Sequence, residues 1–282
     1  MADKPAHNKE FEKTRKLLDQ LLEESKLYSQ SNDYQELLDF VVRLRSFAPF
    51  NAMLLHIQKP GLSYAASKYD WWNKFERYPK EDARPLIILW PFGPVALVYD
   101  VQDTEGKKLP EDAFSFVAKG EMAPETFKGF TNRCQAKGIN CTMVDKGDNM
   151  AGLIRAVNRA VKNNDRPEYE VKINKNHKTE VKFSTLVHEL GHLYLGHLGR
   201  DVCLKIPDRH HLPQSRVEIE AESLAYIVCS RNSVKPKSQS YLVNFIKKGD
   251  SIDHIDIYQI MRAAGQVENL LGLTHDRTGF AD

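Results

Sequence analysis

The chain has 282 residues, and its 40 Lys+Arg nearly balance its 38 Asp+Glu, leaving a formal net charge of +2. This balance excludes a protein whose whole surface is a basic nucleic-acid glove. The 41% hydrophobic content excludes an acidic disordered chain without a core, and the length predicts about two domains of ordinary size.

The N-terminus and the cysteines bear on the cellular compartment. The chain begins with the polar segment MADKPAHNKEFEKTRK, which lacks the apolar region of a secretory signal. No apolar run approaches the ~18 residues that span a bilayer. Four cysteines are present without a CxxC pair: Cys134, Cys141, Cys203 and Cys229. These features predict a reduced, cytoplasmic protein without a membrane partner.

The first part of the chain predicts three helices. Residues 9–28 place leucines among charges at helical spacing, which predicts an amphipathic helix. Ser31 and the two residues after it offer an N-cap for a second helix, which we expect to reach about Ser46. Pro49 then interrupts the pattern, and residues 51–58 predict a short third helix that stops at the following Pro-Gly pair.

A hairpin is expected next. Residues 65–77 are rich in aromatics and predict a helix. The apolar, partly β-branched runs at 86–90 and 95–100 are separated by Pro-Phe-Gly-Pro, which predicts a β-hairpin. Residues 101–123 contain several Gly and Pro residues and predict a loop.

A domain boundary is expected near residue 120, between a first domain of residues 1–120 and a second of residues 121–282. The second domain mixes strands with long helices, which makes the whole chain α+β. Its expected elements are a helix at 125–137, strands at 139–144 and 168–174, helices at 182–197 and 213–229, and two more helices ending near Leu271.

The segment STLVHELGHLYLGH at 184–197 carries the chemistry. His188, Glu189 and His192 form an HExxH motif. Two His four apart on a helix differ by ~40° in azimuth, so both imidazoles leave one face, and this spacing suits two ligands of one tetrahedral zinc ion. Glu189 can reach a water on that metal without being its third ligand. The alternative is a helix with two hydrogen-bonded core histidines and a surface glutamate, but burying three ionisable groups on an apolar helix without a metal or partners is costly.

The third ligand is expected on a later helix. The long form HExxHxxGxxH requires a glycine at position 195 and a histidine at position 198, but the chain has Leu195 and Leu198. His197 is displaced by one residue and is expected to turn to a different face.

Three glutamates in the segment VEIEAE at 217–222 are the candidates. Glu218 and Glu222 share a helix face. We assign Glu218 as the ligand and Glu222 as the acceptor of an imidazole N–H, with Glu222 as ligand the alternative. Glu220 is expected to point away into solvent, and a purely solvated face for all three glutamates is the further alternative.

The second domain resembles the ImmA/IrrE-type zinc metallopeptidases. The likeness covers about 125–245 and rests on STLVHELGHLYLGH, VEIEAESLAYIVC and SQSYLVNFI. In that family a Glu followed by Ala, an acidic or amide residue and an apolar-x-Ala sequel marks the third-ligand helix. Here those positions are Glu218, Ala221, Glu222 and Leu224-Ala225. The resemblance implies a zincin-like metallopeptidase domain.

The first domain resembles the N-terminal domain of ArdC-type antirestriction proteins, which implies single-stranded DNA binding. The matching residues are Asn51–Gln58, Trp72, Arg77, 83–91 and 98–106. That family also joins such a domain to a zinc-peptidase-like one, so the domain order fits.

The composition of the first domain gives this idea partial support. From Arg43 to Arg84 there are eight basic and four acidic residues, a net charge of +4, with eight aromatics interleaved. Basic groups with aromatic faces serve sequence-tolerant single-strand binding, although core packing of the aromatics is the alternative. The expected DNA contacts are Arg43, Arg45, Asn51, Gln58, Trp72 and Arg77.

The motif predicts peptide-bond hydrolysis of a protein or peptide substrate. Zinc held by His188, His192 and Glu218 would activate a water, and Glu189 would take its proton and pass it to the leaving amine. Other divalent ions also suit these ligands. An oxyanion donor is expected among Tyr194, His210, His211 and Tyr226. The strand at 168–174 can pair with an extended substrate or be purely structural.

Three functions remain open on the sequence. The first is a zinc protease recruited to DNA or to a DNA-bound protein. The second is a single-stranded-DNA-binding antirestriction-type protein whose metal site is structural or weakly active. The third is a regulatory protease that cleaves a repressor, with the first domain as a partner sensor.

Overall fold

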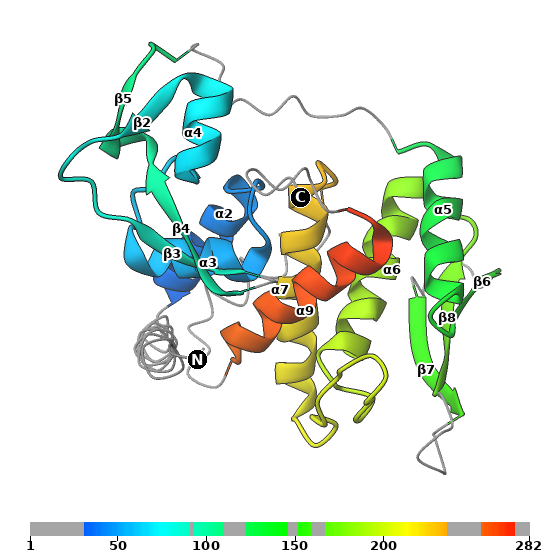
Figure 1. The fold of residues 1–282 in the computed structure, drawn as a ribbon. Coiled ribbons are helices and arrows are strands. Elements are labelled where there is room, and N and C mark those ends of the chain that lie inside the picture. Colours follow the sequence, from blue (N-terminus) through cyan, green and yellow to red (C-terminus); the bar gives the residue numbers. More distant parts are fainter. Residues whose placement is uncertain are drawn as a thin grey trace, which may run out of the picture. The chain divides into compact units, whose positions relative to one another are not determined.

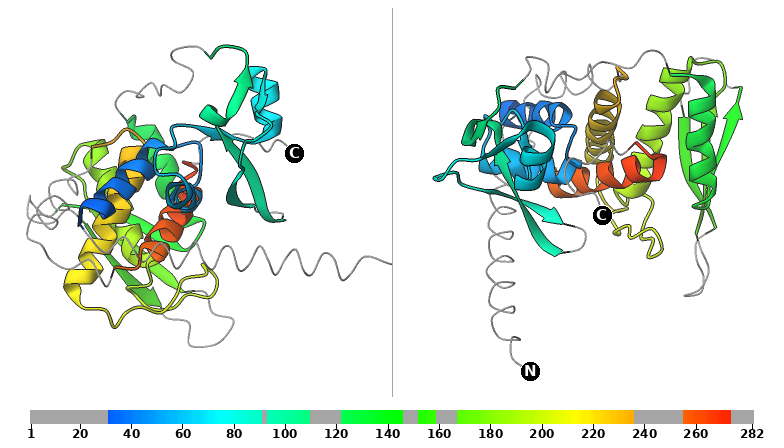
Figure 2. Two further views of the ribbon diagram at one scale, coloured as in Figure 1. Left: turned by 90° about the vertical axis from the view of Figure 1, so that its left-hand side faces the viewer. Right: turned by 45° about the horizontal axis from the view of Figure 1, so that its top comes forward.

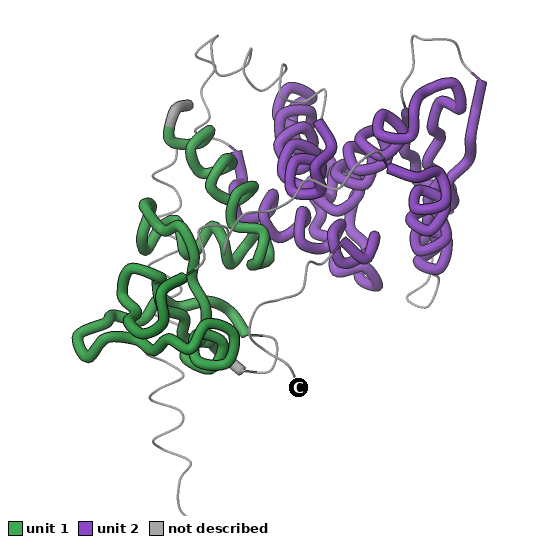
Figure 3. The backbone as a smooth tube through the Cα atoms, turned by 90° about the horizontal axis from the view of Figure 1, so that it is seen from above, with its two compact units in different colours: residues 1–117, 275–282 green, residues 118–274 purple. Residues whose placement is uncertain are grey.

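The computed structural model describes residues 31–90, 93–109, 122–145, 152–158, 167–235 and 255–273. The chain divides into two compact units (Figure 3): unit 1 comprises residues 1–117 and 275–282, and unit 2 comprises residues 118–274. The helix expected over 9–28 and the boundary expected near 120 lie outside the described residues. Within the described ranges, no helix combines the length and the hydropathy that crossing a bilayer requires.

Two helices open the described part of unit 1. Helix α2 (Ser31–Arg43) buries an apolar face formed by Leu37, Leu38 and Val41. It ends at Arg43, short of the expected Ser46. Helix α3 (Pro49–Gln58) begins at the proline that was expected only to interrupt the chain, because a first-turn position needs no backbone N–H.

The predicted hairpin is confirmed. Strands β3 (Leu86–Trp90) and β4 (Gly93–Asp100) pair antiparallel, and β1 (Ala65–Ala66) pairs with the other side of β4. The resulting sheet has the order β1-β4-β3. Figure 1 shows β3 and β4 side by side.

The single helix expected over 65–77 is wrong at both ends. Helix α4 covers only Lys68–Phe75, and it is capped by the Ser67 hydroxyl, which accepts a hydrogen bond from the Asp70 N–H. It ends where Glu76 adopts a left-handed conformation (φ 52°), and β2 (Arg77–Pro79) follows.

The loop expected over 101–123 is wrong in its first six residues. These form the short 3-10 helix η2 (Val101–Asp103) and strand β5 (Thr104–Gly106). β5 pairs antiparallel with β2. The residues beyond Leu109, up to Glu121, lie outside the described part.

Unit 2 contains a three-stranded sheet of order β6-β8-β7. Strands β6 (Ile139–Val144) and β8 (Glu168–Asn174) confirm the two predicted strands and pair in parallel. Strand β7 (Gly152–Asn158) was not predicted, and it pairs antiparallel with β8. β8 is therefore the central strand, paired on both sides, and cannot accept a substrate strand as the sequence suggested.

Four helices complete the described part of unit 2. They are α5 (Pro124–Gln135), α6 (Thr179–Tyr194), α7 (Gln214–Arg231) and α9 (Ile257–Leu271). All four fall close to predicted segments, although α6 begins and ends earlier than 182–197. The remaining predicted helix, before α9, falls on residues outside the described part.

Helix α6 is the central element of unit 2. It contacts β7 and β8 as well as α7 and α9, and the right-hand view of Figure 2 shows it running between α7 and the sheet. Its side chains Leu186, Val187, Leu190 and Leu193 are fully buried. A buried ion pair, Arg231 Nε to Glu268 Oε1 at 2.7 Å, fastens α7 to α9. The helix that carries the HExxH motif is thus held by the core on several sides.

Candidate metal centre

The two histidines of the motif project from one side of α6. Their Nε2 atoms lie 3.0 Å apart, and their rings are nearly perpendicular. His188 is 21% exposed and His192 is 13% exposed. Burial, followed by the neighbouring charges of His188 and His197, lowers the pKa of His192 to about 3. A neutral imidazole keeps a ring-nitrogen lone pair for a ligand.

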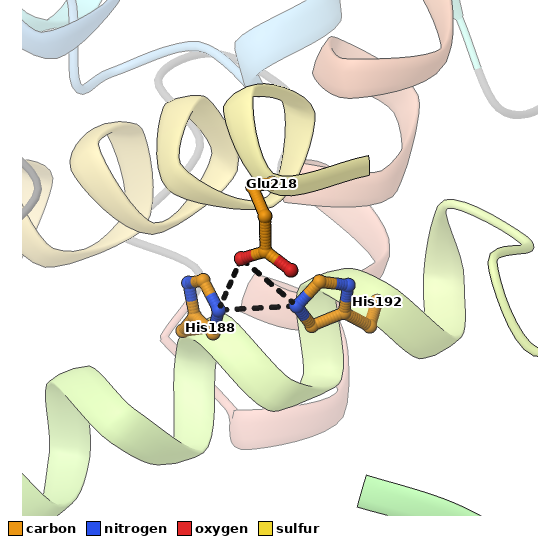
Figure 4. A group of neighbouring side chains, drawn as sticks. All are labelled: His188, His192 and Glu218. Carbon is orange, nitrogen blue, oxygen red and sulfur yellow. Dashed lines mark hydrogen bonds and ion pairs between the residues drawn. The ribbon is translucent and has the colours of Figure 1, made fainter. Parts of the chain in front are cut away.

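Glu218 on α7 completes the cluster. Its Oε2 lies 3.7 Å from His188 Nε2 and 3.9 Å from His192 Nε2, and Figure 4 shows the three side chains converging. The other carboxylate oxygen, Oε1, accepts a hydrogen bond of 2.6 Å from Gln214 Nε2. One oxygen of Glu218 is thereby anchored and the other faces the imidazoles.

The three donor atoms fit one divalent metal ion. They all lie within 4.8 Å of one another. Ligands about 2.0–2.2 Å from a tetrahedral zinc ion are roughly 3.3–3.6 Å apart, and the observed separations bracket that range. Two imidazoles and a carboxylate are also the ligand set of hydrolytic zinc sites, which leave one position open.

Close packing between α6 and α7 brings the three candidate ligands together. A Cβ on Gly191 would lie 3.4 Å from Leu224 Cδ2 and 3.5 Å from the Ala221 carbonyl oxygen. These are ordinary van der Waals distances, so a methyl group would fit, and α7 packs closely on the helix turn that separates the two histidines. A larger side chain there would push Glu218 away from its partners.

Glu189 lies beside this cluster, between α6 and the sheet. It is buried, with 8% of its surface exposed. Burial raises the pKa of Glu189 to about 7; a backbone hydrogen bond from Ile154 opposes that effect, and the charge of Glu218 adds to it. A carboxyl group whose pKa lies near neutrality can both accept and return a proton, which general acid–base catalysis requires.

Strand β7 lies directly against Glu189. A Cβ on Gly152 would lie 2.4 Å from Thr185 Cγ2 and 3.0 Å from Glu189 Oε1. Only glycine allows this close approach. Among the described strands, β7 pairs with β8 alone, and the backbone hydrogen bond from Ile154 to Glu189 places β7 beside the candidate site.

The glutamates next to Glu218 behave differently from one another. Glu222 Oε1 lies 3.6 Å from His188 Nδ1, on the side where an imidazole partner was expected. The expectation that Glu220 is solvated is wrong, because it is fully buried. Arg209 binds it through both oxygens at 2.7 and 2.8 Å, and Arg216 Nε donates at 2.9 Å.

His197 is not one of the three clustered donors, and its contact with His192 was not predicted. Its Nδ1 lies 3.1 Å from Nδ1 of His192, and its Nε2 lies 3.3 Å from Glu220 Oε2. The sequence does show Leu-Gly-His shortly after the motif. Whether that histidine returns to the end of α6 depends on how the chain turns there.

The four expected oxyanion donors lie in two kinds of environment. Tyr194 and Tyr226 are buried, at 5% and 8% exposure. His210 is exposed and its Nδ1 contacts Asp208 Oδ1, and His211 is exposed beside it. An oxyanion role for any of the four stays a prediction.

Several expected DNA contacts bind groups within unit 1. The side-chain amide of Asn51 bonds both backbone groups of Leu89, and that of Gln58 bonds both backbone groups of Ile87. These two residues fasten α3 to β3. Arg43 donates to the Leu62 carbonyl, and Arg77 donates to the Thr104 and Lys107 carbonyls. Arg45 is half-buried.

Among the six expected DNA contacts, Trp72 exposes a large aromatic ring. It is 60% exposed on α4, and two further aromatics are also exposed there and on the adjoining β2, Tyr69 at 66% and Tyr78 at 47%. Trp71, by contrast, is fully buried and donates from Nε1 to the Tyr99 carbonyl. A DNA contact remains a prediction for all six expected residues, and Tyr69 and Tyr78 were not among them.

No family model and no curated protein matches the chain. Among solved structures, it is similar to two crystal structures of the antirestriction protein ArdC from plasmid R388. For the metal-free structure the TM-score is 0.36 at 15% identity, over 79% of this chain and 82% of that one. For the Mn(II)-bound structure the TM-score is 0.38 at 16% identity, over 86% and 96%. Both TM-scores and both identities are low.

Proposed function

We propose that unit 2 is a metal-dependent hydrolase that cleaves peptide bonds. The observation that carries this proposal is the convergence of His188 Nε2, His192 Nε2 and Glu218 Oε2, with the buried Glu189 alongside. An HExxH helix completed by a glutamate from a later helix is the arrangement that zinc peptidases use. Zinc is the proposed ion, although the same ligands suit other divalent metals.

Metal binding and proton transfer are assigned to different residues. His188, His192 and Glu218 would hold the ion, which when bound supplies a Lewis acid that polarises a carbonyl and lowers the pKa of water. Glu189 would accept the proton released in the attack and deliver it to the departing amine. Its raised pKa matches that exchange near neutral pH.

The position of β7 supports an extended peptide as the substrate. Within the described residues, the edge of β7 away from β8 has no partner strand, and β7 lies against Glu189, so a substrate strand can add to the sheet there through main-chain hydrogen bonds. Such pairing would present consecutive peptide groups to the three ligands. This role replaces the one that the sequence suggested for β8.

Metal dependence tests the proposal. The purified full chain, loaded with Zn²⁺, is incubated with a mixture of unfolded proteins, and new peptide termini are identified by mass spectrometry. We expect cleavage that disappears after treatment with a chelator and returns when Zn²⁺ is restored. Cleavage that persists in excess chelator, or no cleavage by protein with one equivalent of bound metal, would overturn the proposal.

A second candidate function, single-stranded DNA binding by unit 1, is favoured by the exposed aromatic side chains. Tyr69, Trp72 and Tyr78 expose large rings on α4 and β2, within the stretch of net charge +4. Bases stack on such rings irrespective of sequence. The resemblance to ArdC-type antirestriction proteins implies the same activity.

One variant decides between a proteolytic and a purely DNA-binding protein. If protection of DNA against restriction depends only on unit 1, Glu189→Gln protects as well as the wild type does. If proteolysis is required, the variant loses protection while it still binds oligonucleotides. Absence of salt-dependent binding to single-stranded oligonucleotides by the full chain would leave the repressor-cleaving protease as the better account.

A further inference from the structure

We propose that His197, anchored by Glu220, is a positioning residue that holds His192 in the tautomer that directs its Nε2 lone pair toward the metal position. The inference rests on the proposed metal centre. It adds a row of three side chains in contact, Glu220–His197–His192, which the HExxH motif does not predict.

The row begins at a carboxylate that can only accept hydrogen bonds. Glu220 is fully buried, and Arg209 and Arg216 both pair with it. The Asp256 backbone N–H adds a longer contact to Oε1 at 3.3 Å. Two guanidinium groups, which stay charged in proteins, keep this carboxylate ionised.

The carboxylate of Glu220 next determines which nitrogen of His197 donates and which accepts a hydrogen bond. Because Glu220 Oε2 accepts, the nitrogen facing it at 3.3 Å, His197 Nε2, carries the proton. A neutral imidazole with a proton on Nε2 has its lone pair on Nδ1.

The contact between His197 and His192 then determines the tautomer of His192. Its Nδ1 faces His197 Nδ1 at 3.1 Å, and two lone pairs cannot form a hydrogen bond, so His192 must donate from Nδ1. Its Nε2 then carries a lone pair and faces His188 and Glu218. Second partners of this kind set ligand orientation and basicity in metal sites.

The turn that ends α6 explains why His197 reaches this position. The His197 N–H bonds the His192 carbonyl and the Gly196 N–H bonds the Leu193 carbonyl, which together form a Schellman motif. Gly196 has φ +84°, and a Cβ there would lie 2.3 Å from the Pro207 carbonyl oxygen. The turn folds His197 back over the helix end, beside His192.

The two proposed histidine ligands therefore have different neighbours at Nδ1. His188 faces the carboxylate of Glu222 directly, at 3.6 Å. On its Nδ1 side, His192 reaches the carboxylate of Glu220 through the imidazole of His197. Substitution of His197 should consequently affect one ligand and leave the other in place.

Nitrogen NMR of the metal-free full chain, labelled with ¹⁵N-histidine, tests the tautomer directly. We expect His192 to carry its proton on Nδ1 in the wild type and to lose that preference in His197→Phe. A wild-type spectrum with the His192 proton on Nε2, or with a doubly protonated His197, would overturn the proposal. This readout needs no metal, so it stands even if the proposed function fails.

Zinc affinity, measured by competition with a chromophoric chelator, gives the second readout. His197→Phe keeps the ring but removes both nitrogens, and we expect about 10- to 100-fold weaker binding. His197→Asn can place an acceptor near the position of Nδ1 and should recover most of that loss. His177→Phe, in the turn between β8 and α6, is the matched control and should bind as the wild type does. Equal affinity of His197→Phe and the wild type would refute the positioning role, and His197→Asn decides the matter if the Phe variant does not fold.

Discussion

Glu220→Gln should destabilise unit 2 strongly, although Glu220 was expected on the surface. Burial alone would raise the pKa of Glu220, but hydrogen bonds from His197 and Arg209, the charge of Arg209 and a hydrogen bond from Arg216 lower it to about 2, from an ordinary value of 4.5. At about 1.4 kcal/mol for each pH unit, this corresponds to roughly 3 kcal/mol at neutral pH. An independent comparison agrees, since removing one partner of a buried ion pair costs about 3–5 kcal/mol.

The pH dependence of this loss follows from the direction of the pKa change. A carboxyl group whose pKa is lowered in the folded state stabilises that state above pH 4.5, and the contribution is lost as the pH falls toward 2. A protonated glutamate resembles glutamine, so the wild type and Glu220→Gln should differ most at pH 7 and converge on acidification.

Urea unfolding of chelator-treated protein, followed by circular dichroism at pH 7, 4.5 and 3, measures the difference. Glu125→Gln, an exposed position at the start of α5, is the matched control and should change stability by less than about 0.5 kcal/mol. Equal midpoints for the wild type and Glu220→Gln at pH 7 would contradict the ionised, clamped carboxylate. So would a difference that stays constant down to pH 3.

Three further substitutions probe the metal centre, the β7 contact and unit 1. Glu218→Ala removes a proposed ligand and should weaken zinc binding by more than about 100-fold, beyond the effect expected for a supporting residue, with chelator competition as the measurement. Gly152→Ala should cost about 1–3 kcal/mol in urea unfolding, because its Cβ would meet Thr185 at 2.4 Å, whereas Leu153→Ala on the exposed side of β7 should cost less. Trp72→Ala should weaken single-stranded oligonucleotide binding by about 1–3 kcal/mol in fluorescence anisotropy, and unchanged binding would remove Trp72 from the interface.

Local pattern was sufficient for the long elements of the fold. The hairpin, β6, β8 and the four helices of unit 2 each have a clear apolar period or flanking turn residues. Strand β7 lacked such a pattern because only Ile154 is buried, while Leu153 and Val157 face outward at 43% and 53% exposure. Its place in the sheet is set by pairing with β8, which is information that a local window does not hold.

The helix over 65–77 failed for a similar reason. Ala65 and Ala66 have high helix propensity, but pairing with Tyr99 and Asp100 on β4 overrides it. Tertiary contacts decided the backbone there.

The candidate site was predictable where spacing along one helix determines geometry. The four-residue interval between His188 and His192 requires a shared face, and Glu218 was selected by its place on a second helix. Glu220 was assigned to solvent because its face of α7 could not be matched to Arg209, which comes from the loop before the helix. The position of His197 depends on the same loop and on the turn at Gly196, and a local sequence pattern does not predict how either of them folds.

The decisive measurement for the proposed hydrolytic centre is peptide cleavage by the wild-type protein and by Glu189→Gln, with bound metal quantified in the same samples. We expect equal metal content and a loss of about 100-fold or more in the rate of peptide cleavage, because Glu189 would move the proton and would not hold the ion. A Glu189→Gln protein that retains its metal and cleaves at the wild-type rate would contradict the proposed hydrolytic centre.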